Sequence, residues 1–401
     1  MKQFFRLDAI LCSSFIFLFI GFLWIIPAQF EVLDPVGEAL SDMELTDIVF
    51  SKLRNSQVSH TDTNIVLVNI GHLKRDEVGE LLSNIDAGNP KVIGIDAFFR
   101  AKKTFDEDIG LIMGLGNVNS PVVMVNELLL PHPNSDCFDS IAYSNPLFTQ
   151  NTTSGFSNFI TGGNEGYRTV RQWMPFGCAS DSTIPAFTSK VLEIYDPANY
   201  KAMVARDNLL ETINWTGNYK AFFHLDYSDV LKKSFNPNFL KDKIVLLGYI
   251  GPQMGVPSFE DIFFTPLNEK TAGRSFPDMY GVTVHANILA QMLNNRYINT
   301  LPTWVNGLIA LVLVYLNVVL FLFIAERYKV YYDLITKVLI LVELIALFTI
   351  TIFGLHWLSI KVELTVAFLA LVFSGDLTEL YIGSLKHLGA NAFRKVKGLF
   401  R

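Results

Sequence analysis

The sequence predicts an extracytoplasmic α/β domain with a mixed sheet, joined to an α-helical transmembrane region of about four helices. Two observations support this fold class. Long apolar segments lie at both ends of the chain, and between them short hydrophobic runs alternate with segments of helical spacing. Half of the 401 residues are hydrophobic and only 17% are charged, which is more apolar than an ordinary soluble domain.

Four apolar segments are long enough to cross a bilayer, which takes roughly 20 residues. The last is the least regular, because Lys361 and Glu363 stand near its start. Trp304 marks the outer edge of the second, where aromatic residues gather at membrane interfaces. The predicted transmembrane helices are residues 9–28, 301–325, 338–355 and 360–382.

The first apolar segment has a rival interpretation as a cleaved signal peptide. Its exit, Ile26-Pro27-Ala28, does not have the small-residue pattern of a cleavage site. Cys12 also comes too early in the segment for a lipoprotein anchor. We therefore expect an uncleaved membrane anchor.

Basic residues in the short flanks of the helices predict the orientation. They gather in residues 1–8, in the loop 326–337 and in the tail 383–401, which four helices would place on one side. The N-terminus and the C-terminus are then cytoplasmic, and residues 29–300 lie outside the cytoplasm. The tail also has the amphipathic composition of a segment that lies on anionic lipid, although a plain positive-inside tail fits equally well.

The segment 29–300 alternates between expected strands and expected helices, as parallel βαβ units do. Residues 155–160 and 167–174 are expected to pair as antiparallel strands around a turn at 162–164. No long linker divides the segment, so we expect one domain with a mixed sheet. The expected core strands are residues 64–70, 91–95, 121–125 and 243–247, and the expected helices include 73–85 and 284–293.

Charge and cysteine content limit the function classes. The formal net charge of −6 argues against a nucleic-acid partner, which requires a basic face. Cys137 and Cys178 lie in the expected extracytoplasmic segment, where an oxidising compartment would allow one disulfide. Two unpaired cysteines are an equally good interpretation.

Seven short motifs follow one another along the chain: 45–47 (LTD), 64–70 (NIVLVNI), 91–99 (KVIGIDAFF), 166–171 (GYRTVR), 243–248 (KIVLLG), 261–267 (DIFFTPL) and 281–287 (GVTVHAN). Their order resembles the CHASE2 domain, an extracytoplasmic sensory module of bacterial receptors, and the resemblance implies a bacterial inner membrane. In that family one transmembrane helix precedes the domain and usually three follow it, which matches the topology expected here. Two departures are Asn69, where the family often has an aspartate, and residues 71–75, which replace a stretch rich in Trp and Pro.

The resemblance implies a sensor. Family members often continue into a cyclase, kinase or other output domain, whereas this sequence ends about twenty residues after the last expected helix. We therefore expect a sensor that lacks its own output domain and acts on a separate membrane or cytoplasmic protein. By analogy with the family we also expect a homodimer.

Several polar residues are candidates for a ligand site, each with a structural alternative. Asp96 follows an expected strand at the end where α/β sheets bind ligands, but it could equally cap the next segment. Asp261 and His285, with Glu260 nearby, are types that bind metals or transfer protons, yet their spacing specifies no metal. Arg168 and Arg171 could bind an anion or pair with carboxylates. Thr265 and Asn287 complete the candidate set, from the family-like loop and helix start.

Besides Glu363 near the start of the last segment, three carboxylates fall within the expected transmembrane helices. An ionised group there costs about 2.5–3.5 kcal/mol on insertion scales, so Glu343 is expected to face another helix or a partner. Asp376 and Glu379 share one helix face. Asn306 and Asn317 could hydrogen-bond between helices. Either these groups only join the helices, or the acidic face binds a membrane partner or an ion.

The function expected first is therefore a sensor that binds a ligand or an envelope component and relays its state through the helices. The alternative is a structural or assembly subunit of a cell-envelope complex. An enzyme has the least support, because no nucleophile–base pair, metal-binding motif or phosphate loop is present, and no cofactor is expected. A deep pocket with perturbed acids near Asp96, Asp261 and His285 would favour an enzyme more strongly.

Overall fold

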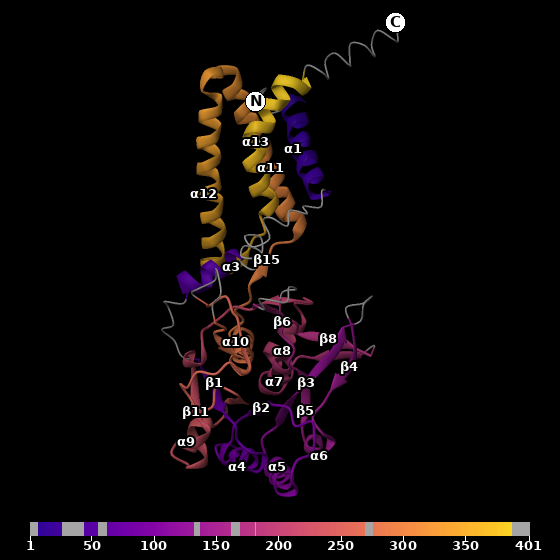
Figure 1. Ribbon diagram of the computed structural model, residues 1–401, viewed down its shortest axis with the longest axis vertical. Helices are drawn as coiled ribbons and strands as arrows, with labels where there is room; N and C mark the ends of the chain where they lie inside the picture. Colours follow the sequence, from indigo (N-terminus) through magenta and orange to yellow (C-terminus); the bar gives the residue numbers. More distant parts are fainter. Residues whose placement is uncertain are drawn as a thin grey trace. The chain divides into compact units, whose positions relative to one another are not determined.

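The computed structural model describes residues 7–25, 44–54, 62–131, 137–161, 169–180, 182–268 and 276–386, and the chain divides into two units (Figure 1). The sheet unit is Val36–Ile298. The helical unit combines Met1–Pro35 with Asn299–Arg401. Each unit has its own apolar core.

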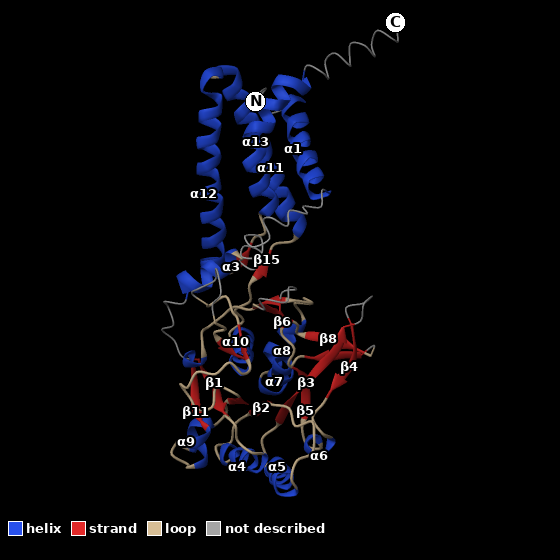
Figure 2. Ribbon diagram, in the orientation of Figure 1, coloured by secondary structure: helices blue, strands red, loops and turns tan. Residues whose placement is uncertain are grey.

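Nine of the described strands form the main sheet of the sheet unit (Figure 2). Its strand order is β11-β1-β12-β2-β3-β4-β8-β9, with β5 beside β3. The core pairings are parallel, as the alternation of strands and helices predicted. The parallel strands are β1 (Asp62–Asn69), β2 (Val92–Asp96), β3 (Val122–Pro131), β5 (Thr153–Phe156), β11 (Phe222–Asp226) and β12 (Ile244–Gly248).

Helices cover both faces of this sheet (Figure 1). Alternate strand residues such as Val66 and Val68 pack with α4 (Arg75–Asp86) and α5 (Phe105–Asn117) in one hydrophobic cluster. On the opposite face, α7 (Phe187–Tyr195) and α10 (Gly281–Leu293) contact the strands. Because both faces are covered, the strands are nearly continuous apolar runs.

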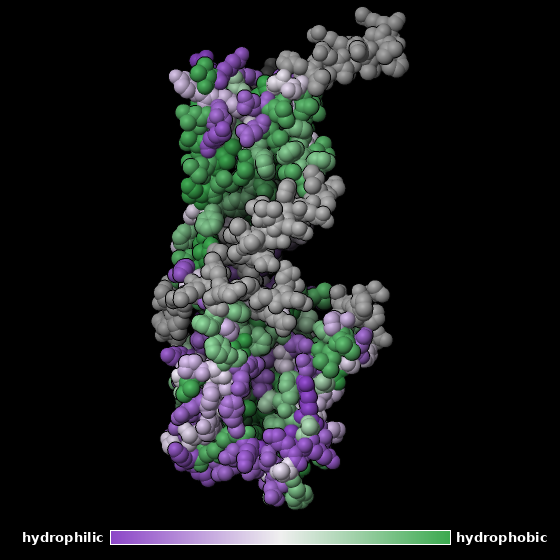
Figure 3. All heavy atoms as spheres, viewed as in Figure 1, coloured by the Kyte–Doolittle hydropathy of each residue, from purple (hydrophilic) through white to green (hydrophobic). Residues whose placement is uncertain are grey.

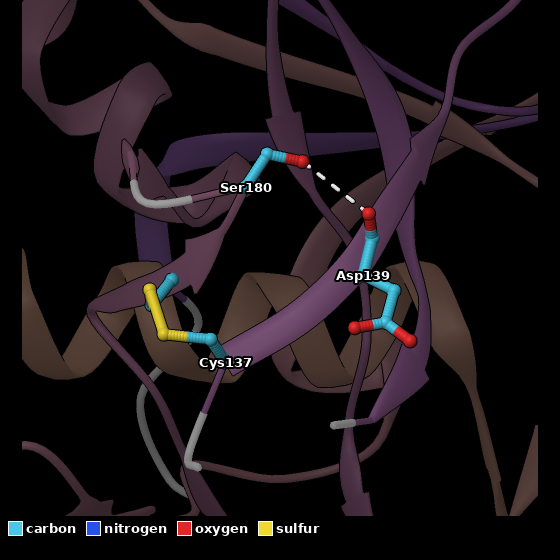
Figure 4. Close-up of a disulfide and its surroundings, with 4 residues drawn as sticks. Cys137, Asp139 and Ser180 are labelled. Carbon is cyan, nitrogen blue, oxygen red and sulfur yellow. Dashed lines mark hydrogen bonds between the residues drawn. A yellow bond between two sulfur atoms is a disulfide. The ribbon is translucent and has the colours of Figure 1, made fainter.

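The edge of the sheet beyond β3 combines antiparallel and parallel pairs and contains the disulfide. β4 (Cys137–Ala142) pairs with β3 in the antiparallel sense, and β8 (Phe176–Ala179) pairs with β4 in parallel and with β9 (Ser182–Pro185) antiparallel. Cys137 and Cys178 stand opposite each other in the β4–β8 pair and are joined by a disulfide (Figure 4). Ser180 donates a hydrogen bond to the Asp139 carbonyl beside it.

Smaller elements complete the sheet unit. The expected antiparallel pair is present between β6 and β7, whereas Gly155 belongs to β5 in the main sheet and the turn 162–164 lies outside the described residues. The strands are β6 (Ile160–Thr161), β7 (Val170–Trp173), β10 (Glu211–Thr212), β13 (Ile262–Phe263) and β14 (Met279–Tyr280). The helices are α3 (Leu45–Ile48), η2 (Val49–Arg54), α6 (Pro146–Thr149), α8 (Pro197–Val204), η4 (Tyr219–Ala221), α9 (Tyr227–Leu231) and η5 (Pro237–Leu240).

Helices α4 and α5 approach each other at glycines. A Cβ at Gly79 would lie 2.2 Å from the backbone oxygen of Gly110, and one at Gly114 would lie 2.4 Å from the Cα of Gly79. Both obstacles are backbone atoms, so no side-chain rotation relieves them. The two helices can pack at this distance only because these positions lack side chains.

Gly79→Ala is expected to destabilise the sheet unit by at least about 1–3 kcal/mol, because the added methyl overpacks the α4–α5 contact. Thermal melting of the full-length chain in detergent measures the effect. Gly116→Ala is the matched control, since a Cβ there meets nothing within 4 Å. Equal melting temperatures for the two variants would contradict this packing.

Three helices among the described residues are long and apolar enough to cross a membrane: Thr303–Arg327, Lys329–Leu358 and Thr365–Leu385. They contain α11 (Thr303–Arg327), η6 (Lys329–Tyr331), α12 (Tyr332–Leu358), α13 (Thr365–Leu380) and η7 (Tyr381–Leu385). Apolar side chains cover their surface, whereas hydrophilic side chains are frequent on the sheet unit (Figure 3). The N-terminal helix α1 (Leu7–Ile25) packs against α11 and α13 in the same core.

Two helix boundaries differ from the sequence-based expectation. α12 is longer at both ends than residues 338–355, and it ends at Ser359, whose φ of 53° is left-handed. The last helix begins at Thr365 instead of residue 360, because Ile360–Lys361 forms strand β16, which pairs with β15 (Asn299–Thr300). Residues 1–6 and 387–401, which include most of the expected basic flanks, lie outside the described residues.

Candidate ligand-binding site

A cavity of about 360 Å³ opens at the carboxyl ends of three neighbouring parallel strands. Asp96 is the last residue of β2, Glu127 lies in β3 just beyond its pairing with β2, and Ser157 follows β5. Ligands of open α/β sheets bind at this edge. The lining residues are Asp96, Phe98, Glu127, Ser157, Asn158, Phe159, Thr161, Asp261, Phe263, Gly281 and His285.

The N-terminus of α10 closes one side of the cavity. Its first residue, Gly281, donates its N–H to the Asp261 carbonyl over 3.1 Å. A Cβ at Gly281 would lie 2.9 Å from a carboxylate oxygen of Asp261, so glycine lets this carboxylate approach the helix. Asp261 itself has a left-handed backbone with φ of 47°, unusual for a residue other than glycine. The loop is thus held in a conformation that places a carboxylate at the helix start.

His285 lies one turn further along α10 and is 3% exposed. Its Nε2 atom is 3.9 Å from a carboxylate oxygen of Asp96. The ring packs against Phe159 and Phe187, with centroid distances of 4.6 Å and 5.0 Å. Within the described chain neither ring nitrogen has a hydrogen-bond partner. A buried polar side chain normally has one, so His285 is a candidate for contact with a bound molecule.

Burial sets the protonation of this cluster. It raises the pKa of Asp96 well above its usual range, and the nearby Asp261 carboxylate raises it further. Asp261 keeps a solvent-exposed surface, yet desolvation by the surrounding protein raises its pKa to about 6, and the backbone N–H of Gly281 near its carboxylate works in the opposite direction. Burial lowers the pKa of His285 to about 3, so this imidazole is neutral at physiological pH. Such perturbed groups are concentrated at functional sites.

Asp96→Asn is expected to raise the melting temperature of the ligand-free chain at pH 7.5. The folded state holds the Asp96 proton to higher pH than the unfolded state, so stability from this group is present at acidic pH and lost as pH rises. Asparagine has no carboxyl proton to lose, so the variant does not lose this stability as pH rises. We expect a gain of at least about 2 °C, which about 1 kcal/mol gives in a domain of this size.

The gain from Asp96→Asn should shrink toward pH 4, because an aspartate in the unfolded chain, with a pKa of about 3.9, then also begins to bind this proton. The difference between variant and wild type is the quantity to follow, because His285 acts in the opposite direction: its lowered pKa costs stability as pH falls below about 6.5. Asp139→Asn, which removes an exposed carboxylate outside the cavity, is the matched control. A gain that does not depend on pH would contradict the assignment.

Arg171 does not line the cavity. Its guanidinium pairs with both carboxylate oxygens of Asp47 in α3, at 3.1 Å and 2.8 Å. Of the two sequence-based alternatives for this arginine, the structure has the carboxylate pair, with Asp47 of the family-like entry segment. Arg168 lies outside the described residues.

Thr265 and Asn287 are bonded to neighbouring segments and do not line the cavity. Thr265 donates its hydroxyl, and its backbone N–H, to the Asp278 carboxylate. Asn287 accepts from the N–H groups of Thr216 and Gly217 and donates to the Gly217 carbonyl. Both side chains are buried, and their bonds hold the loops before β14 and η4. Of the expected ligand residues, the cavity therefore unites Asp96, Asp261 and His285.

The intramembrane carboxylates separate into two groups. Glu343 of α12 is half-buried and accepts a 2.5 Å hydrogen bond from Asn317 of α11, so it joins two helices. Asp376 and Glu379 are exposed on one face of α13. The expected acidic face is thus made by Asp376 and Glu379, without Glu343.

Sequence reasoning missed four aromatic and acidic residues of the cavity: Phe98, Glu127, Phe159 and Phe263. One signal was available for Glu127, because it follows an expected strand at the same edge of the sheet as Asp96. The three phenylalanines carry no such signal. An isolated phenylalanine in a sequence is most simply interpreted as part of a hydrophobic core.

A deep pocket lined by acids with shifted pKa values would favour an enzyme. The cavity meets part of this condition, since the pKa values of Asp96 and Asp261 are raised. Nucleophilic catalysis needs a nucleophile in contact with its base, and within the described residues no hydroxyl bonds to His285. Among those residues there is likewise no group of three side chains able to hold a metal ion.

The molecule is thus an α/β domain with a ligand-sized cavity, in a chain whose helices are suited to a membrane. The family model described as the CHASE2 domain matches residues 20–320, well over half of the chain, and the chain therefore belongs to this family. CHASE2 is an extracytoplasmic sensory domain and not a catalytic one. No curated protein and no solved structure matched the chain.

Proposed function

We propose that this chain is a membrane-anchored sensor that binds a ligand in the cavity and relays its state to a separate protein. The observation that supports this most directly is the position of the cavity. In a domain of a sensory family, it lies at the strand ends where α/β proteins bind ligands. Relay requires two conformations that bind the ligand with different affinity.

Helix α10 offers a direct route for the relay. It supplies Gly281 and His285 to the cavity and ends at Leu293, and α11 begins at Thr303 after only nine residues, 294–302. A ligand that changes the position of α10 therefore acts on a short segment of chain that leads into the first C-terminal transmembrane helix. Small helix shifts of this kind are common in switching proteins.

The proposed location is a bacterial inner membrane, with α1 as the fourth transmembrane helix and both termini in the cytoplasm. Three features support it: the basic flanks in the sequence, the extracytoplasmic nature of the family, and the packing of α1 with α11 and α13. A homodimer is proposed as well, because a state change passed through a few helices is transmitted readily between two copies.

The exposed acidic face of α13 supports a membrane partner. Asp376 and Glu379 are polar groups on an otherwise apolar helix, and such groups bind between helices. The double variant Asp376→Asn, Glu379→Gln is expected to lower recovery of the partner in a gentle-detergent pull-down by roughly fivefold or more.

Glu343→Gln is the control for this pull-down. Glutamine can still accept the hydrogen bond from Asn317, so the α11–α12 contact and the recovery of the partner should be unchanged. If the double variant recovers as much partner as wild type, the acidic face does not bind the partner and has no part in the relay. A loss with Glu343→Gln as well would point to a general disturbance of the helical unit.

An assembly subunit of an envelope complex is the second candidate, favoured by one feature of α5. Phe105, Ile109 and Met113 are exposed at successive turns on one side of this helix. An exposed apolar stripe of this kind is typical of a protein-binding surface. In this function the sheet unit is a docking surface, and the cavity needs no ligand.

A further inference from the structure

The charges around the cavity are unbalanced. Asp96, Glu127 and Asp261 are its three carboxylates, and within the described part of the chain only Glu127 has an arginine or lysine partner, Arg100, at the rim. No arginine or lysine among the described residues forms an ion pair with Asp96 or Asp261. His285 does not supply the missing charge, because burial keeps it neutral. A positive charge in the cavity would stabilise both ionised carboxylates.

Aromatic rings form much of the remaining wall. Phe159 and Phe263 meet edge to face at a centroid distance of 5.0 Å. At the rim, the guanidinium of Arg100 lies 4.3 Å from the centre of the Phe98 ring. The faces of such rings attract cations, and organic ammonium groups are the ligands that use them best. The wall therefore suits a cation that also has an apolar part.

His285 gives independent evidence for a ligand. It is 97% buried, it lines the cavity, and neither ring nitrogen has a partner among the residues that the structure describes. A neutral imidazole has one nitrogen that accepts a hydrogen bond. An ammonium group donates up to three, and beside Asp96 it would find both a carboxylate and this nitrogen.

We propose that the ligand of this cavity is a small organic amine, bound as a cation between Asp96 and Asp261 with its carbon chain against Phe159 and Phe263. This inference rests on the proposed ligand-sensing function and specifies its ligand class. The cavity volume, about 360 Å³, lies near the lower end of the range for small-molecule sites. Calcium or magnesium fits less well, since each prefers at least six oxygen ligands. Among the described residues no group of three His, Cys, Asp or Glu side chains could hold a metal ion.

The test is calorimetric titration of the full-length chain in lipid nanodiscs with four probes: putrescine, the uncharged diol of the same length, succinate and calcium. Putrescine is expected to bind, and the diol and succinate are not. Asp96→Asn and Asp261→Asn are each expected to weaken putrescine at least about tenfold, the loss of one charge-assisted hydrogen bond. Asp139→Asn, which removes a carboxylate outside the cavity, should bind like wild type.

A second readout is the proton balance. Because an amine cation favours the ionised carboxylates, binding near pH 6 should release protons, seen as a dependence of the heat on the buffer's ionisation enthalpy. Binding of succinate or calcium alone, or putrescine binding that survives both cavity variants, would overturn the amine assignment. Succinate binding lost in Arg168→Gln would leave ligand sensing intact with an anion as its ligand. Absence of binding by all four probes would overturn the amine class.

Discussion

Asp47→Ala is expected to destabilise the sheet unit by about 3–5 kcal/mol, the usual cost of removing one partner from a buried ion pair. The Asp47 side chain is 2% exposed and that of Arg171 is 14% exposed, so the arginine would keep its charge in a place with little water. Glu44 cannot replace the lost carboxylate fully, because it lies 3.9 Å from Arg171 and is itself partly exposed. Thermal melting of the full-length chain measures the loss.

Arg171→Met is the informative companion, since it removes the other charge and keeps much of the volume. With both substitutions the uncompensated charge is gone, so the double variant should recover a large part of the stability lost in Asp47→Ala. Simple addition of the two single losses would contradict a coupled pair. Arg171, which the sequence analysis considered for an anionic ligand, would then need a role other than its ion pair with Asp47.

Asn287→Ala is expected to cost about 2–5 kcal/mol, because two backbone N–H groups lose their acceptor in the interior. These groups belong to Thr216 and Gly217, and the amide also donates to the Gly217 carbonyl at 2.9 Å. Asn287 is fully buried, so water cannot replace the amide without opening the loop. The same melting experiment reports the effect.

Asn294→Ala is the matched control for Asn287→Ala. Asn294 follows the same helix and also bonds through its side-chain amide, but it is exposed, so water can replace its bonds to Asp62 and Ala290. Its loss should stay within about 0.5 kcal/mol. An equal loss at both positions would mean that the bonds of Asn287 do not hold the loop.

The parallel core of the fold could be predicted because its signals are local. Strands such as residues 64–70 and 243–247 are short apolar runs bounded by polar segments, and β1 and β12 occupy those positions within one or two residues. Strand order depends on contacts between distant segments, and the sequence has no local signal that β12 lies between β1 and β2. Helix boundaries also depend on tertiary pairing. Because Ile360–Lys361 pairs with β15 as strand β16, α13 begins only at Thr365.

The site could be predicted in part for a similar reason. Asp96 and His285 stand at recognisable positions, a strand end and a helix start, and the cavity includes both. Arg171 was ambiguous because its partner, Asp47, is more than a hundred residues away. Whether Thr265 and Asn287 contact a ligand or the backbone depends on the direction of each side chain, which the fold decides.

The central claim, a sensor with a ligand cavity and a separate output protein, is tested most directly by purification of the full-length chain in a gentle detergent. Mass spectrometry of the eluate identifies retained proteins and small molecules together. The account predicts a membrane or cytoplasmic output protein, and a small molecule that is retained by wild type and by Asp139→Asn but lost from Asp96→Asn. An eluate with only envelope structural proteins, or only the chain itself and no small molecule, would contradict the sensor and favour the assembly subunit.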